Sequence, residues 1–256
     1  MERLLPGWAQ RRLDPAQRYG LRLTLFAIAL SLVGIPFALL VTAVTSRGRV
    51  VEFDTSISEQ LFEWKLDYPF LTQLFNFVSH LGQPVWFWVL VGGTAIYLWR
   101  RNQRRLVAFL LTTTIGGSLV NTAVKISVNR PRPTFRDPDA ITFQTGKSFP
   151  SGHAMSSTIA YGALLLIFLP TIPVKKRKWA LLAYAVLVLF IGVSRLGLGV
   201  HYVSDVVGGY MLGLAWLTLS VAAFQIWRQE RGKPPVQPAK KGLEPEAAPK
   251  LKPTGS

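Results

Sequence analysis

A stretch near residue 200 contains Arg195, His201 and Asp205 at the join between two long apolar segments, where a cluster of charges is costly. If a helix begins near His201, Asp205 lies four residues further on and projects from the same face, so its carboxylate can hold and polarise the imidazole. That pairing is typical of a nucleophile or a general base. Gly197 and Gly199 supply a flexible turn that could fold the arginine back towards the histidine. Structural ion pairing is the alternative reading of this stretch taken alone.

A second polar stretch, Lys-Ile-Ser-Val-Asn-Arg-Pro-Arg-Pro, runs from residue 125 to residue 133. Lys125 at the end of a helix, together with Arg132 held between two prolines, would present cations with little freedom to move away. Cations arranged in this way suit a multiply charged oxyanion. In the alternative reading, Lys125 extends to a membrane interface and the arginines meet lipid head groups.

A third polar stretch, Phe-Pro-Ser-Gly-His, ends at His153 and immediately precedes an apolar run. Ser151 can cap the new helix, and the free backbone N–H groups beside Gly152 then form an anion-binding position. Gly152 allows a ligand oxygen to approach the backbone closely, and His153 in the first turn can give or take a proton. The alternative is an ordinary capped helix with a buried histidine.

The composition is that of a membrane protein. Half of the 256 residues are hydrophobic and only 16% are charged, and the mean hydropathy is positive. The net charge of +16 would suit nucleic acid only if the cations shared one soluble face, but they fall in clusters between apolar spans. We therefore expect a lipid bilayer as partner and no nucleic acid. The absence of cysteine excludes disulfides and thiolate chemistry.

The apolar runs predict an all-α membrane domain at residues 23–227. Each run is near the ~20 residues needed to cross hydrocarbon. The six predicted transmembrane helices cover residues 23–44, 85–99, 106–124, 151–169, 179–193 and 202–227. Residues 45–82 are acidic and aromatic with roughly helical spacing, which predicts an amphipathic interfacial helix in the first outer loop. Residues 1–22 form a basic N-terminal segment, and the Pro, Lys and Ala-rich residues 228–256 are predicted to be disordered.

Six crossings place both termini on one side of the membrane. The basic N-terminal segment, residues 100–105, residues 175–178 and the tail all fall on that side, which the positive-inside rule identifies as cytoplasmic. The three polar stretches fall on the opposite side. We therefore expect them to meet at the outer face of the membrane.

Together, Lys-x6-Arg-Pro at residues 125–133, Pro-Ser-Gly-His at residues 150–153 and Ser-Arg-x5-His-x3-Asp at residues 194–205 closely resemble a known three-part signature. It is that of the phosphatidic acid phosphatase type 2 superfamily, in its membrane lipid phosphatase branch. The superfamily also includes bacterial acid phosphatases and vanadium haloperoxidases. All three motifs are complete and in the family's order, and the resemblance spans roughly residues 46–227.

The resemblance implies a role for each motif residue. It makes His201 the nucleophile that forms a phosphohistidine, Asp205 the carboxylate that orients it, and His153 the acid that protonates the leaving oxygen. The implied phosphate-binding residues are Lys125, Arg132, Ser151, Gly152 and Arg195. Cations and two opposed histidines can stabilise phosphoryl transfer without a metal, so we expect no metal and no cofactor.

The expected function is that of an integral lipid phosphatase of a bacterial plasma (inner) membrane, with its active site facing the periplasm or exterior. Its substrate would be a phosphorylated membrane lipid. Undecaprenyl diphosphate is favoured, and phosphatidate or phosphatidylglycerophosphate also fits. The alternatives are a lipid phosphotransferase using the same site, a lipid or anion transporter, and a haloperoxidase holding vanadate in the same cradle. Transporter sites tend to lie at the bilayer midplane, which disfavours that reading.

Overall fold

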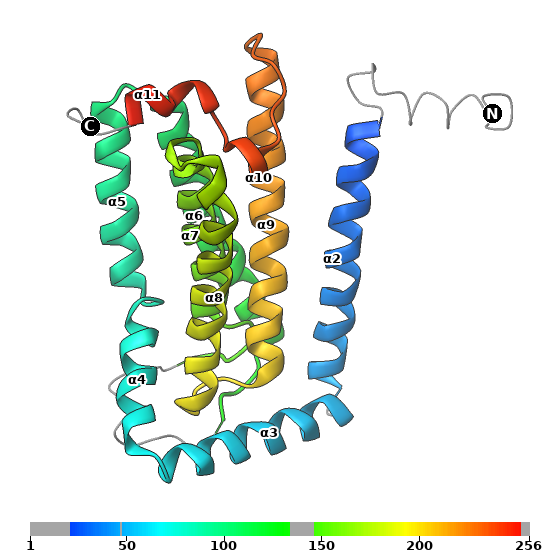
Figure 1. Cartoon of the computed structure of the whole chain (residues 1–256). Helices are drawn as coiled ribbons and strands as arrows, with labels where there is room; N and C mark the ends of the chain where they lie inside the picture. Colours follow the sequence, from blue (N-terminus) through cyan, green and yellow to red (C-terminus); the bar gives the residue numbers. More distant parts are fainter. Residues whose placement is uncertain (1–20, 47, 134–145, 252–256) are drawn as a thin grey trace, which may run out of the picture.

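The computed structural model describes residues 21–46, 48–133 and 146–251, without the side chains of residues 21–30, 32 and 66. The described residues form helices and no strands, which confirms the all-α prediction (Figure 1). The basic N-terminal segment lies almost wholly outside the described residues. The helices are α2 (Leu21–Thr45), α3 (Arg49–Leu66), α4 (Pro69–His80), α5 (Pro84–Arg100), α6 (Arg104–Val128), α7 (Gly152–Phe168), η1 (Leu169–Thr171), α8 (Val174–Gly197), α9 (Val203–Glu230), α10 (Pro238–Lys241), η2 (Pro245–Ala247) and α11 (Ala248–Leu251).

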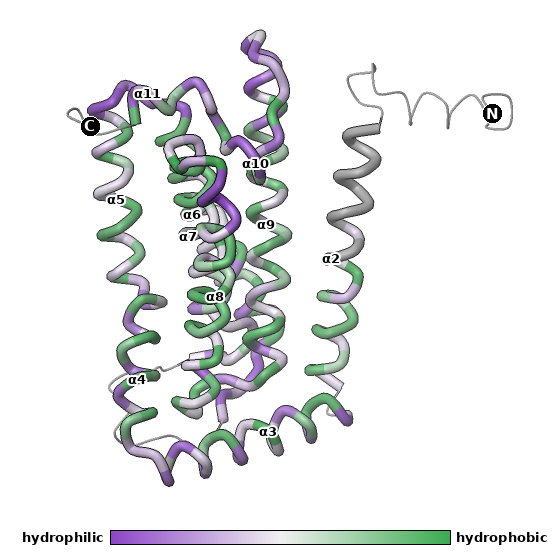
Figure 2. Tube along the Cα trace, in the orientation of Figure 1, coloured by the Kyte–Doolittle hydropathy of each residue, from purple (hydrophilic) through white to green (hydrophobic). Residues whose placement is uncertain are grey.

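The long helices run side by side along one axis, and their hydropathy is suited to a bilayer (Figures 1 and 2). Within the described ranges, five segments are long and apolar enough to cross a membrane. They are Pro69–Arg100, Arg104–Val128, Gly152–Thr171, Val174–Gly197 and Val203–Glu230. Helix α2 corresponds to the first predicted crossing and packs against α9. With α2 included, the number of spans agrees with the prediction.

Helix α3 lies across one end of the bundle (Figure 1). Residues Val33–Thr45 and Arg49–Lys65 meet at an angle of 82°, so the chain turns from a membrane-crossing direction into the plane of the interface. This agrees with the predicted amphipathic helix in the first outer loop. It ends at Leu66, and most of the remaining acidic and aromatic stretch up to residue 82 forms α4.

The second span is longer than predicted, because α4 continues into α5. The sequence of α4 contains no Asp, Glu, Lys or Arg, so it can enter the bundle at little desolvation cost. Helix α4 packs against α8 and buries Leu71, Asn76 and Ser79. Hydrogen bonds from Gly82 N to Ser79 O (2.9 Å) and from Gln83 N to His80 O (3.1 Å) join the two helices.

Helix α7 is the centre of the bundle and packs against α6, α8 and α9. The apolar core lies towards the end away from α3, where the buried side chains include Leu98, Leu106 and Ile167. Small residues bring the helices close together. A Cβ atom on Gly117 would lie 2.5 Å from Ile159 Cδ1, so a larger side chain would separate α6 from α7.

The C-terminal tail is folded over its described length, and the prediction that it is disordered is wrong for residues 228–251. Leu243 and Leu251 are buried in the main core. Leu243 N donates to Leu166 O (3.1 Å), and Tyr97 Oη donates to Leu251 O (2.8 Å). Arg228 is fully buried and donates to both carboxylate oxygens of Glu246, at 3.0 and 2.7 Å. Composition predicted disorder because these few apolar and paired residues are diluted by Pro and Lys.

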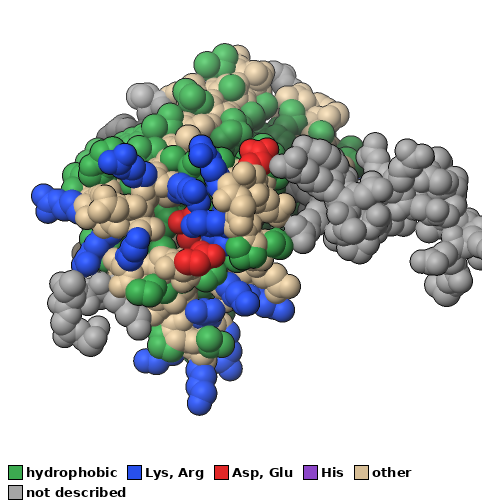
Figure 3. All heavy atoms as spheres, turned by 90° about the horizontal axis from the view of Figure 1, so that it is seen from above, with side chains coloured by type: hydrophobic (Ala, Val, Ile, Leu, Met, Phe, Trp, Pro, Cys, Tyr) green, Lys and Arg blue, Asp and Glu red, His purple; other side chains and the backbone are tan. Residues whose placement is uncertain are grey.

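Lys and Arg side chains gather at the end of the bundle that carries α10 and α11, as Figure 3 shows from above. The basic turn at residues 100–105 and the basic start of α8 at residues 175–178 lie at this end. Helix α3 lies at the opposite end (Figure 1). The charge distribution therefore agrees with the predicted positive-inside pattern.

Candidate active site

The three polar motifs lie at the α3 end of the bundle, where four helix ends meet (Figure 1). Lys125 lies in the last turn of α6, and His153 in the first turn of α7. Arg195 lies in the last turn of α8, and Asp205 in the first turn of α9. Alternate crossing directions thus bring distant parts of the sequence to one end.

His201 and Asp205 form a buried pair. His201 Nδ1 lies 3.2 Å from Asp205 Oδ2, and each side chain is at most 1% exposed. The turn before them contains Gly199, whose φ of +66° lies in the left-handed region that favours glycine. Gly197, by contrast, belongs to α8, and a Cβ atom there would lie 2.2 Å from the Phe75 ring. The turn therefore needs the conformational freedom of glycine at Gly199, while Gly197 lets the Phe75 ring pack against α8.

The second ring nitrogen of His201, Nε2, lies beside the guanidinium of Arg132. Arg132 Nη1 lies 3.2 Å from His201 Nε2 and donates to Val200 O at 2.8 Å. Burial, followed by the charges of Arg132, Arg195 and Lys125, holds the pKa of His201 well below its ordinary value. In the neutral ring with its Nδ1 proton directed at Asp205, the Nε2 lone pair faces Arg132 Nη1.

The lowered pKa of His201 predicts the position of the acid limb of activity. If His201 is the nucleophile that the sequence predicts, its neutral form is lost when pH falls through its pKa, so the acid limb of kcat/KM should lie below the ordinary value of 6.5. The measurement is a pH profile with a lipid monophosphate and a lipid diphosphate. An acid limb at the same pH with both substrates reflects an ionisation of the enzyme and not of the substrate. A shared limb centred at or above 6.5 would contradict the assignment.

Ser151 and Gly152 connect the second motif to the other two. Ser151 caps α7, as predicted, by accepting from Ala154 N (3.4 Å), and its own N–H donates to Asp205 O (2.8 Å). A Cβ atom on Gly152 would lie 3.9 Å from Lys125 Cε, so the lysine passes close to the start of α7. The first N–H groups of a helix point outward and favour anions. Lys125 and the N-terminus of α7 therefore form one electropositive surface.

Arg195 and His153 carry buried polar atoms that lack a partner within the described part of the chain. Arg195 is fully buried and donates through Nη1 to the Ser79 hydroxyl, but its Nε and Nη2 have no such partner. The same holds for His153 Nε2. Each unsatisfied buried polar group costs about 1–3 kcal/mol. A ligand with several acceptor oxygens would satisfy these groups.

All eight residues singled out from the sequence lie in this region. Direct contacts connect the motifs in pairs, through Arg132 with His201, Ser151 with Asp205, and Lys125 beside Gly152. No group of three or more His, Asp or Glu side chains suitable for a metal ion occurs among the described residues. The eight residues themselves offer cations, imidazoles, the Ser151 hydroxyl and the Asp205 carboxylate.

Four further residues join the site that the sequence reasoning did not place there. Arg130 donates to both Asp54 and Asp205, at 2.8 Å each. The Ser148 hydroxyl contacts Asp205, and the Ser79 hydroxyl accepts from Arg195. The only feature of the sequence that pointed to Arg130 was its position two residues before Arg132. Asp54 was one of several carboxylates on an amphipathic helix, and spacing does not say which of them is buried.

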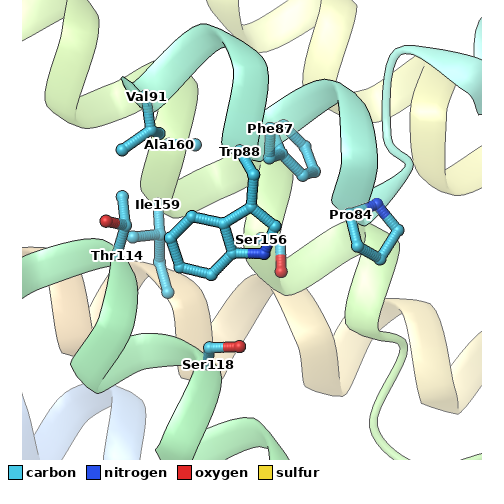
Figure 4. A pocket seen from close by; sticks show the side chains of 9 residues that line it. All are labelled: Pro84, Phe87, Trp88, Val91, Thr114, Ser118, Ser156, Ile159 and Ala160. Atoms are coloured by element: carbon cyan, nitrogen blue, oxygen red, sulfur yellow. The ribbon is translucent and has the colours of Figure 1, made fainter. Parts of the chain in front are cut away.

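A cavity of about 80 Å³ lies between α5, α6 and α7 (Figure 4). Its lining is largely apolar, with Phe87, Trp88 and Ile159 around it and the hydroxyls of Ser118 and Ser156 at its edge (Figure 4). Ser156 lies one helical turn from His153. An apolar chain attached to a group at His153 would therefore find matching surface next to it.

Comparisons with known proteins give a family and several relatives. Residues 105–229 match the model of the PAP2 superfamily. Phosphatidylglycerophosphatase B of Bacillus subtilis is 28% identical over 70% of this chain and 86% of its own length. Lipid A 1-phosphatase of Rhizobium etli is 30% identical over 45% of this chain and 48% of its own.

A solved structure of a transmembrane PAP2 type phosphatidylglycerolphosphate phosphatase from Bacillus subtilis has the same fold. Its TM-score is 0.69 at 25% identity, covering 76% of this chain and 94% of that one. The names of these relatives are those of lipid phosphatases, the solved one is a transmembrane protein, and the matched residues 105–229 contain all three motifs. The chain is therefore a multi-pass membrane protein whose residues 105–229 match the PAP2 superfamily, and it is similar to lipid phosphatases of that superfamily.

Proposed function

We propose that this protein hydrolyses the terminal phosphate of a membrane lipid phosphate or diphosphate through a phosphohistidine intermediate. The observation that carries the proposal is the placement of His201, with Nδ1 towards a carboxylate and Nε2 towards a cation, at the point where the three motifs meet. A neutral imidazole oriented by a carboxylate is suited to attack on phosphorus, and the cations around it are suited to the charge of the transferred group.

In the first step, His201 Nε2 forms a bond to phosphorus while the bond from phosphorus to the leaving oxygen breaks. The leaving lipid oxygen receives a proton from His153. Arg132, Arg195 and Lys125 stabilise the equatorial oxygens, with help from the Ser151 hydroxyl and the Gly152 N–H. In the second step, water gives a proton to His153 and attacks phosphorus. Inorganic phosphate leaves and His201 is restored.

A lipid substrate is favoured over a soluble one by the largely apolar cavity between α5, α6 and α7 (Figure 4), whose lining residue Ser156 lies one helical turn from His153. The site lies at an end of the bundle, so the phosphate can bind at the interface while the chain stays among the helices. Undecaprenyl diphosphate and phosphatidate fit this description. The names of the Bacillus relatives support phosphatidylglycerophosphate equally.

The site is proposed to face the periplasm or exterior of a bacterial plasma membrane, with both termini in the cytoplasm. The support is the gathering of Lys and Arg at the opposite end of the bundle (Figure 3). A site near one membrane surface also argues against an alternating-access transporter, whose binding site lies near the midplane.

The test is a panel of lipids incubated with the purified full-length protein in detergent, with release of inorganic phosphate as the readout. We expect release from at least one of undecaprenyl diphosphate, phosphatidylglycerophosphate and phosphatidate, and no loss of activity with a chelator, because the cations come from side chains. Phosphate transfer to a second lipid without release would indicate a phosphotransferase. Activity lost with chelator and restored by a divalent cation would contradict the metal-free mechanism.

A further inference from the structure

We infer that Asp54, on the interfacial helix α3, is a positioning residue for the active site, acting through Arg130 to keep the carboxylate of Asp205 turned towards His201. This inference rests on the proposed phosphatase function. Asp54 belongs to none of the three motifs and reaches the site from a separate helix. It is nonetheless 1% exposed, whereas the neighbouring acidic residue Glu52 is exposed.

Arg130 lies between two carboxylates and binds each through a different nitrogen. Its Nη2 donates to Asp54 Oδ2 and its Nη1 to Asp205 Oδ1, both at 2.8 Å. The guanidinium also lies over the Tyr202 ring, 4.2 Å from its centre. Arg130 is 7% exposed, so these partners replace water as its surroundings. A planar guanidinium held on two sides has one orientation, and that orientation determines where Asp205 Oδ1 can lie.

The two oxygens of Asp205 have different partners. Oδ1 accepts from Arg130, while Oδ2 accepts from Tyr202 N (2.9 Å) and contacts both the Ser148 hydroxyl and His201 Nδ1 (3.2 Å). Fixing Oδ1 therefore fixes the plane of the carboxylate and directs Oδ2 at the histidine. The tautomer and orientation of a nucleophilic histidine depend on such a partner.

Asp54 also holds the beginning of α9. Its Oδ1 accepts from Ser204 N (2.9 Å), and its Oδ2 contacts the Ser204 hydroxyl, which in turn accepts from Arg130 Nη1 (2.7 Å). Asp54 could thus act in two ways, by orienting Arg130 or by anchoring the helix. The experiment must separate these two roles.

The charges favour the first role. The charges of Arg132, Arg195 and Lys125 already act on His201, so the buried Arg130 adds a fourth cation to this region. Without Asp54, the full charge of Arg130 would fall on Asp205, because removing one partner leaves an uncompensated buried charge. Asp205 would then be drawn towards Arg130 and away from His201.

The experiment compares Asp54→Asn in the wild-type and Arg130→Gln backgrounds, with lipid phosphate hydrolysis as readout. Asparagine keeps the size and an acceptor oxygen but removes the charge. We expect kcat to fall about 10- to 100-fold, the usual effect of losing a partner behind a directly acting group, with KM within about 2-fold. Glu52→Gln, a matched change on the exposed face of α3, should leave kcat unchanged.

In the Arg130→Gln background, adding Asp54→Asn should lower kcat by no more than about 2-fold. The effects of two substitutions are not additive when one residue acts through the other. An equal loss in both backgrounds would assign Asp54 to anchoring α9 and overturn the inference. Wild-type kcat in Asp54→Asn would overturn it as well. A wild-type protein that releases no phosphate from any lipid would instead refute the proposed function.

Folding is checked by thermal unfolding of each variant in the same detergent. If Asp54→Asn does not fold, Arg130→Lys replaces it, since it keeps the charge and the contacts of Asp54 with Ser204 but removes the planar fork that binds Asp54 and Asp205 through two nitrogens. A lower kcat at unchanged KM in folded Arg130→Lys supports the inference. Unchanged kcat overturns it.

Discussion

Replacing His201 with alanine is expected to abolish turnover, lowering kcat by on the order of 10⁴-fold or more, because the group that bonds to phosphorus is removed. No covalent phosphoenzyme should form. The checks are release of inorganic phosphate and trapping of labelled protein after rapid quenching with a phosphate-labelled lipid. The bond from nitrogen to phosphorus should be labile in acid and stable in base, which distinguishes phosphohistidine from a phosphoester.

The control for this prediction is His80→Ala. His80 is exposed on α4, and its Nδ1 lies 2.6 Å from Asn76 O, away from the contacts of His201. Its replacement should leave both turnover and phosphoenzyme intact. Full activity in His201→Ala with labelled protein still forming would transfer the nucleophile to another residue.

Replacing Arg195 with alanine is expected to lower kcat/KM by about 10²- to 10³-fold, the usual effect of removing one preorganised donor to a developing charge. The reason is that Nε and Nη2 of this buried guanidinium have no partner among the described residues and remain for substrate oxygens. Inhibition by vanadate should weaken in parallel, because vanadate presents similar oxygens.

Two further variants make the Arg195 result specific. Arg195→Lys keeps the charge but not the fork of donors, so it should recover only part of the lost activity. Arg231→Ala removes an exposed arginine at the far end of α9 and should have no effect. Unchanged vanadate inhibition in a folded, less active Arg195→Ala would show that the arginine supports the structure and does not bind the phosphate.

The crossings and the motifs could be predicted from local sequence, for two physical reasons. A helix that crosses hydrocarbon must be apolar for about 20 residues, so the runs that became α6, α7, α8 and α9 are visible without knowledge of packing. The alternation of direction then places the ends of these helices, and with them His153, Arg195 and His201, on one side. The contact of His201 with Asp205 is also local, since four residues separate them.

Three features depended on packing and could not be read from local sequence. Helix α4 became part of the second span because it packs on α8, although its sequence is equally compatible with an interfacial helix. The tail folded because Leu243 and Leu251 meet the core and Arg228 meets Glu246.

The third feature is the buried network behind the active site. Asp54 lies 76 residues from Arg130 and 150 residues from Ser204, and no periodicity relates positions so far apart. A carboxylate on an amphipathic helix is stable in water at any position on the polar face. Only the docking of α3 against α8 and α9 brings a buried arginine to one particular carboxylate, and that docking is a property of the assembled bundle. The sequence alone thus predicted the eight motif residues as a phosphate site and determined at which end of the helices they lie. The tertiary structure decided what holds them in place.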